Sequence, residues 1–180
     1  HPAYLDLTGN SNHDPDLSKK LLAEAGFPDG FETTLKLPPP AYARKGGEII
    51  AAQLRKVGIQ TVITNLEWSQ WLEEVFRNKD YGLTIVAHTE PFDIGIYGRP
   101  DYYFQYDSKD FQGIMDSLTS ETDPATRKKL LQQAQTMISN DYVNGFLFQR
   151  PNLSVINAKV SGIWANSPTQ ATDLTAVSWE

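Results

Sequence analysis

The sequence predicts an α/β fold in which a mostly parallel sheet is flanked by helices. Strand-like and helix-like patterns alternate between residues 31 and 87, in the order strand, helix, strand, helix, strand. The connections between these strands are long enough for the right-handed crossovers that join parallel strands. The last strand, expected at 82–87, is a continuous apolar run, which is typical of a strand buried on both faces.

Composition excludes several classes of function. The chain has 180 residues and a formal net charge of −6, whereas a general nucleic-acid binder needs a basic surface. Cysteine is absent, which excludes disulfides, thiol catalysis and Cys-based metal centres, and the three histidines (His1, His13 and His88) are too few for a multi-histidine centre. The length allows one domain with a sizeable core, or two small domains at most. Because the chain does not begin with Met, we expect either a removed leader or a piece of a longer protein.

The first part of the chain predicts a strap and then a helix. Residues 1–13 are polar and irregular and indicate a linker or strap. Asp14 can cap a helix whose first turn contains Pro15, and Gly26 ends it in a left-handed conformation. The helix carries an apolar face at helical spacing: Leu17, Leu21, Leu22 and Ala25.

The next four elements follow from changes in hydrophobic period. Residues 31–37 alternate as a strand, and 59–64 are rich in β-branched residues. A helix is expected at 43–57, and another at 67–76, where we expect Trp68 and Trp71 to pack in the core. The expected buried stripe of the 43–57 helix is Ile49, Ile50, Leu54 and Val57.

The second half begins with a long segment that has no periodicity. Residues 88–108 contain prolines, glycines and a cluster of aromatic residues, and loops of this length are functional or anchored by their own side chains. Helices are expected at 109–119 and 123–141, and strands at 145–149 and 153–157. We expect an α/β ligand-binding lobe over 14–160 and a polar tail over 161–180.

The carboxyl ends of the three parallel strands indicate where a ligand binds. In an open parallel sheet, ligands bind beyond these ends. The ends lead into residues 38–44, 65–68 and 88–93, which should meet at one edge. The third loop is the richest in chemistry, because its carboxylates could pair with the amino group of a ligand. The candidate ligand-binding residues are His88, Thr89, Glu90, Asp93 and Tyr97.

Other interpretations of this loop stay open. Glu90 and Asp93 could instead cap nearby backbone N–H groups, act as the acid/base pair of a hydrolase or isomerase, or join His88 around a metal ion. The aromatic residues between 97 and 106 could anchor the loop to its own domain, stack on a ligand or form a protein-interaction module. No nucleotide, metalloprotease or serine-hydrolase motif is present, so we expect no catalytic residue, no metal and no cofactor.

Three segments resemble a known family. Residues 14–31 resemble the "DPxxAKxLLxEAGYPxGF" segment of family 5 of the extracytoplasmic solute-binding proteins, the peptide, dipeptide and nickel receptors of ABC importers. Residues 53–59 resemble the "QLxKxGI" junction of that family, and 80–83 resemble its "YDxxxxxW" approach to the ligand loop. The resemblance spans most of the chain, from about His13 to Trp179.

The resemblance implies one lobe of a two-lobed periplasmic-binding-protein-like (type II) fold, with residues 161–180 returning toward a missing N-terminal lobe. It implies capture of an oligopeptide or similar small solute outside the cytoplasmic membrane, in the periplasm or in a lipid-anchored form, and delivery to a membrane permease. In peptide-binding relatives an aspartate within "WxxDYxDP" holds the amino group of the ligand. The matching stretch here has Val86 in place of the tryptophan and Thr89 at or beside the aspartate, which leaves Glu90 or Asp93 as substitutes.

Overall fold

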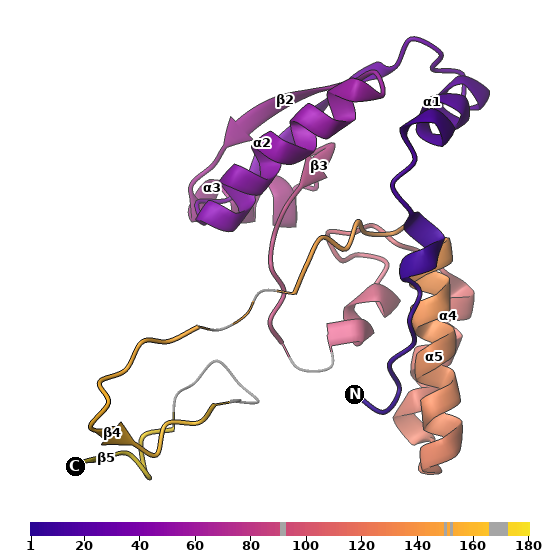
Figure 1. The fold of residues 1–180 in the computed structure, drawn as a ribbon. Coiled ribbons are helices and arrows are strands. Elements are labelled where there is room, and N and C mark those ends of the chain that lie inside the picture. Colours follow the sequence, from indigo (N-terminus) through magenta and orange to yellow (C-terminus); the bar gives the residue numbers. More distant parts are fainter. Residues whose placement is uncertain (91–92, 150, 152, 166–172) are drawn as a thin grey trace.

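The computed structural model describes residues 1–90, 93–149, 151, 153–165 and 173–180, and Figure 1 shows three parts. An α/β part holds the sheet. A helical hairpin lies beside it, and the chain then leaves the hairpin as an extended C-terminal arm. None of the helices in the described ranges is both long and apolar enough to span a membrane.

The sheet is parallel, as the sequence predicts. It contains β1 (Phe31–Leu37), β2 (Ile59–Asn65) and β3 (Leu83–Thr84) in the order β2-β1-β3. All seven residues of β1 pair with β2, whereas β3 pairs with β1 over two residues. The third strand is therefore shorter than the predicted 82–87, because regular pairing ends before the apolar run does.

Helix α2 (Ala41–Lys56) packs on the sheet through small residues rather than through the predicted stripe. Its buried residues are Ala43, Gly47 and Ala51, and the predicted Ile49 is 60% exposed. A Cβ on Gly47 would lie only 2.3 Å from Leu37 Cδ1. The prediction of a stripe that includes Ile49 was wrong, because close approach of the helix to β1 selects the face with the smallest side chains.

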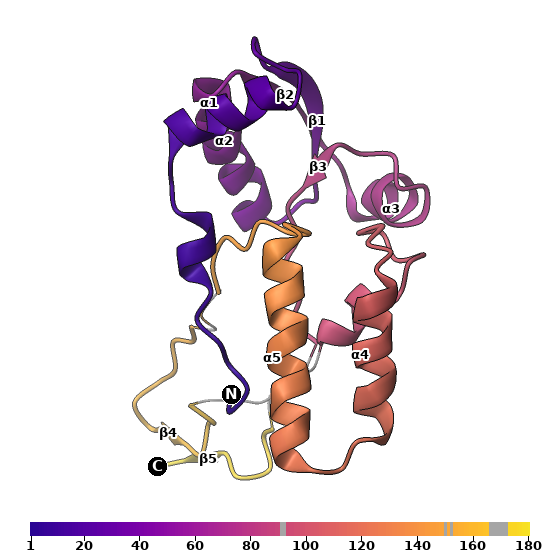
Figure 2. The ribbon, with the colours of Figure 1, turned by 90° about the vertical axis from the view of Figure 1, so that its right-hand side faces the viewer.

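Helix α1 (Pro15–Glu24) has the predicted ends. The Asp14 side chain accepts a hydrogen bond from Leu17 N at 2.8 Å, and Gly26 has φ +90°. The leucine face is not buried, however, and Leu21 is 53% exposed. This face stays exposed because α1 lies at the outside of the α/β part (Figure 2).

The segment predicted as one helix over 67–76 divides in two. Helix α3 (Trp68–Trp71) continues into a π-helical segment, η2 (Leu72–Arg77). Trp71 and Val75 are buried, whereas Trp68 is 43% exposed, so only one of the two predicted core tryptophans is in the core. Trp71 Nε1 donates to Thr84 Oγ1 at 3.0 Å, which joins this segment to β3.

The helical hairpin consists of α4 (Lys109–Ser120) and α5 (Pro124–Asn140), close to the predicted bounds. They pack on a short 3-10 segment, η3 (Asp93–Gly98), around a core of Ile96, Tyr97, Phe111, Ala134 and Ile138. The N-terminal strap, which includes η1 (Thr8–Ser11), runs along α5 (Figure 2). There, Gln135 Nε2 donates to the backbone oxygen of Ala3 at 2.8 Å.

The predicted strands at 145–149 and 153–157 are not formed by the described residues of those ranges. The C-terminal arm has instead a small antiparallel pair, β4 (Val160–Ser161) with β5 (Ser178–Trp179). Phe146, Phe148 and Leu153 are mostly exposed. The composition of this segment is that of a strand, but a strand also needs a neighbour whose backbone groups pair with it.

The turns before β1 and β2 yield a stability prediction. Gly30 has φ +78°, and a Cβ placed on it would lie 1.9 Å from the backbone oxygen of Gly58. We expect Gly30→Ala to lower the free energy of unfolding by about 2 kcal/mol or more, because it adds left-handed strain and a backbone clash. Urea denaturation of the 180-residue chain measures the change.

Gly9→Ala is the matched control, because nothing lies within 4 Å of its added Cβ. It should change the free energy of unfolding by less than about 0.5 kcal/mol. Equal stability of the two variants would contradict the packing described at Gly30.

Candidate functional site

The three carboxyl ends of the sheet strands meet, as the sequence predicts. Leu66 N, just after β2, donates to the backbone oxygen of Leu37 at 2.8 Å. The hydroxyl of Tyr42, in the first turn of α2, accepts a hydrogen bond from Ala87 N at 2.9 Å. The segments that follow β1, β2 and β3 are thus joined at one edge, which we call the rim and define as residues 40–44, 65–67 and 87–90 together with Asp93.

His88 is the central side chain of the rim. Its Nδ1 lies 2.7 Å from Asp93 Oδ2, and its Nε2 lies 2.8 Å from the hydroxyl of Tyr103. Both side chains of the His88–Asp93 pair are about a quarter exposed. The imidazole is therefore fixed at both nitrogens while one edge of the pair stays open to solvent.

Tyr103 connects this site to the core. Its side chain is 3% exposed and packs with Leu66, Trp71 and Val75, and its burial raises the pKa of its hydroxyl. The hydroxyl therefore stays protonated at neutral pH and can donate or accept a hydrogen bond. The imidazole of His88 also lies nearly parallel to the Tyr103 ring, with 6.1 Å between ring centroids.

The two remaining polar residues of the loop differ in their roles. The Glu90 carboxylate accepts a hydrogen bond from Thr89 N at 3.0 Å, which is the backbone-capping role considered for it. Backbone hydrogen bonds, that from Thr89 first, lower the pKa of Glu90, which is exposed. The carboxylate is thus charged and accessible at neutral pH. Residues 91–92 of the predicted loop lie outside the described residues.

Tyr97, unlike Glu90, is buried. It is 9% exposed, and its ring packs against Phe104 and Phe111 in the core of the helical hairpin. Burial, and then the charge of Asp93, raise the pKa of Tyr97. Together with the burial of Tyr103, this favours the interpretation in which the aromatic residues anchor the loop, and it counts against an interaction module built on exposed rings.

A cationic side chain of the rim was not singled out from the sequence. The guanidinium of Arg44 donates to the backbone oxygen of Leu66 at 3.3 Å and to Glu67 Oε1 at 3.2 Å. Tyr103 was considered only as part of the aromatic cluster. Arg44 could have been found from its position just after β1. The contact between His88 and Tyr103 could not, because the two residues are 15 positions apart and no local sequence pattern predicts their contact.

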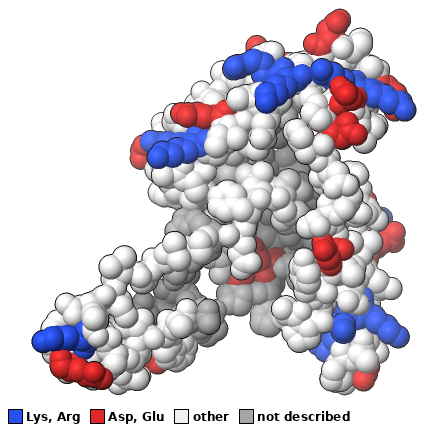
Figure 3. Space-filling view, in the orientation of Figure 1, with Lys and Arg blue, Asp and Glu red and all other residues white. Residues whose placement is uncertain are grey.

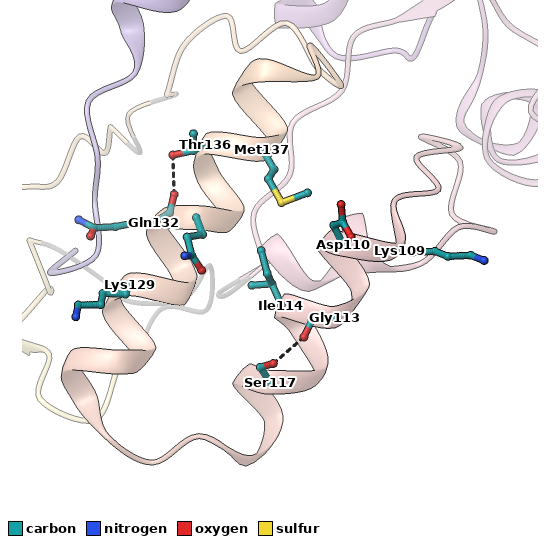
Figure 4. Close-up of a pocket in the computed structure, with 10 residues that line it drawn as sticks. Lys109, Asp110, Gly113, Ile114, Ser117, Lys129, Gln132, Thr136 and Met137 are labelled. Atoms are coloured by element: carbon teal, nitrogen blue, oxygen red, sulfur yellow. Dashed lines mark hydrogen bonds between the residues drawn. The ribbon is translucent and has the colours of Figure 1, made fainter.

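A groove among the described residues lies away from the rim. Figure 3 shows one face of the molecule, with basic side chains mainly over the α/β part and acidic side chains near the centre of the view. The groove is open, has a volume of about 820 Å³ and lies between α4 and α5, where Ile114 and Met137 face each other (Figure 4). None of the predicted site residues lines that groove.

Comparison with known proteins identifies the family. The model of "Bacterial extracellular solute-binding proteins, family 5 Middle" matches residues 1–113. Heme-binding protein A of Haemophilus influenzae is 27% identical over 158 residues, which cover 77% of this chain and 28% of that protein. Di/tripeptide-binding protein 4 of Pseudomonas aeruginosa is 30% identical over 151 residues, which cover 69% of this chain and 26% of that protein.

Solved structures confirm the fold class. Clavulanic acid biosynthesis oligopeptide binding protein 2 aligns with a TM-score of 0.83 at 20% identity, over 99% of this chain and 36% of that one. The dipeptide binding protein of Pseudoalteromonas sp. SM9913, in complex with Met-Leu, aligns with a TM-score of 0.77 at 22% identity. This alignment covers 99% of this chain and 38% of that one. The chain thus has the fold of the matching part of these binding proteins.

The chain spans between a quarter and a third of the length of these two curated relatives. Both relatives are binding proteins by name, so the hydrolase or isomerase alternative is not favoured. The family match covers more than half of the chain and agrees with the resemblance seen in residues 14–31. The chain therefore belongs to family 5 of the bacterial extracellular solute-binding proteins.

Proposed function

We propose that this chain is a solute-binding lobe of an ABC importer receptor, which captures a peptide or similar small solute and delivers it to a membrane permease. The observation that carries the proposal is the rim, where three parallel strands present their carboxyl ends and His88, Glu90 and Asp93 together. Membership of a solute-binding family supports it, as do the names of relatives that bind dipeptides and tripeptides.

The chemistry of the rim suits a solute with a protonated amino group. Asp93 is partly exposed and is oriented by its contact with His88 Nδ1, and Glu90 adds a second accessible carboxylate. A carboxylate and an ammonium group form strong, charge-assisted hydrogen bonds. In this proposal Asp93 holds the amino group, Glu90 and Thr89 line the same edge, and Tyr97 supports the loop from below.

The C-terminal arm exposes apolar side chains that a second lobe of the receptor could cover. Phe146 and Phe148 are 73% and 64% exposed, and they lie two residues apart in an extended segment, so they can share one face. Apolar side chains exposed together mark an interaction surface. In this proposal the arm pairs with an N-terminal lobe of the receptor, outside the cytoplasmic membrane, in the periplasm or on a lipid anchor.

A receptor of two lobes yields a prediction for the chain alone. Because each lobe holds half of the contacts, the 180-residue chain should bind solute with negligible affinity. Calorimetric titration with a mixture of dipeptides and tripeptides measures it. Micromolar binding by the single chain would contradict a site that needs two lobes.

Substitution of Asp93 tests the role of the rim in the receptor that carries this chain. The co-purifying solute is first identified by mass spectrometry, and its affinity is then measured by calorimetry in the presence of EDTA. We expect Asp93→Asn to weaken binding about tenfold to a hundredfold, because a hydrogen bond to a charged group contributes about 1.5–3 kcal/mol.

Asp16→Asn is the control, since Asp16 is an exposed carboxylate in the first turn of α1. It should leave the affinity unchanged. If Asp93→Asn behaves like Asp16→Asn, then Asp93 does not hold the solute, and if no solute co-purifies the receptor function itself fails.

A further inference from the structure

Three potential metal ligands converge on the rim. His88, Glu90 and Asp93 each offer one ligand atom, and these atoms all lie within 4.8 Å of one another. Among the residues that the structure describes, they are the one such group of three or more histidine and acidic side chains. One nitrogen and two carboxylate oxygens form a donor set that suits borderline divalent cations such as Zn²⁺.

His88 has a partner at each ring nitrogen, and the partner at Nε2 could fix the ring for metal binding. A metal-binding histidine presents one ring nitrogen to the ion while the other donates a hydrogen bond that fixes the ring. Here Nδ1 points at Asp93 and Nε2 contacts the hydroxyl of buried Tyr103. Because this hydroxyl can accept as well as donate, it can take the hydrogen bond from a protonated Nε2 and leave the lone pair of Nδ1 for an ion.

The charge at this place also favours a cation. The Asp93 and Glu90 carboxylates make no ion pair with Lys or Arg within the described ranges, and His88 is the one basic side chain beside Asp93. Ligand atoms that share a Zn²⁺ ion lie about 3–3.5 Å apart, since each bond is about 2.0–2.2 Å. The Nδ1–Oδ2 distance of 2.7 Å is that of a hydrogen bond, so the two side chains must move slightly apart to share an ion, and the exposed side chain of Glu90 can rotate to complete the set.

We infer that His88 Nδ1, Asp93 and Glu90 bind one divalent cation of the zinc type on the rim. Three protein ligands leave at least one coordination position open to a solute donor or to water. This inference departs from the expectation of no metal. It deepens the proposed function and rests on it for the role of the ion, because the ion would occupy the place where the solute is captured.

Zinc titration of the 180-residue chain tests the site. The parent protein for the test carries His1→Ser and His13→Gln, so that His88 is its sole imidazole and the terminal amine with His1 forms no chelate. We expect calorimetry with ZnCl₂ to give one ion per chain. His88→Gln should weaken binding at least tenfold, Glu90→Gln should weaken it less, and Tyr103→Phe should weaken it severalfold without changing the stoichiometry.

Glu48→Gln is the matched control, because Glu48 is an exposed carboxylate on α2. It should bind zinc as the parent does. Unchanged affinity in His88→Gln, or several equivalent ions per chain, would overturn the inference.

A second measurement does not depend on the folding of a variant. In the ¹⁵N spectrum of the parent, zinc should shift the Nδ1 resonance of His88 as a metal ligand and leave Nε2 protonated. The absence of this shift at saturating zinc overturns the inference. If the chain binds zinc but no solute co-purifies with the receptor that carries it, the proposed function alone is refuted. If that receptor captures solute in EDTA through Asp93 and the chain binds no zinc, the metal site alone is refuted.

Discussion

Parallel pairing of β1 with both of its neighbours is the constraint on which the rest of the structure depends. Because β2 and β3 run in the same direction as β1, the chain leaves all three strands at the same edge. Residues far apart in sequence therefore meet, as Tyr42 and Ala87 do through a hydrogen bond of 2.9 Å. An antiparallel β3 would place His88 at the opposite end of the sheet and separate it from the segments after β1 and β2.

The position of the site also depends on how the two packed parts of the chain are joined. Tyr103 belongs to the core of the α/β part, with Leu66 and Trp71, whereas Tyr97 belongs to the core of the helical hairpin. Tyr102 and Phe104 pack against both. Because this loop is anchored on two sides, it loses less conformational entropy when it binds a ligand. The rim is preorganised in this sense.

The sequence predicted what depends on local pattern and failed where the result depends on distant partners. Asp14 and Gly26 mark the ends of α1 because capping and left-handed geometry are local. Ile49 was misplaced because the period of large apolar residues competes with close packing of Gly47 on Leu37. Similarly, 88–93 was predicted to be the ligand loop from its position after β3, whereas the attachment of His88 to Tyr103 arises only from tertiary packing.

The two ligands proposed for the rim, an ammonium group and a divalent ion, make opposite demands on the same atoms. An ammonium group needs a carboxylate of Asp93 that no other cation neutralises, and the contact with His88 Nδ1 can then remain as it is. A divalent ion needs the lone pair of Nδ1 and inserts between the two side chains. The hydroxyl of Tyr103 accommodates either state, because it can donate to Nε2 in the first and accept from it in the second. In both proposed states the packing of Tyr103 in the core therefore stays the same.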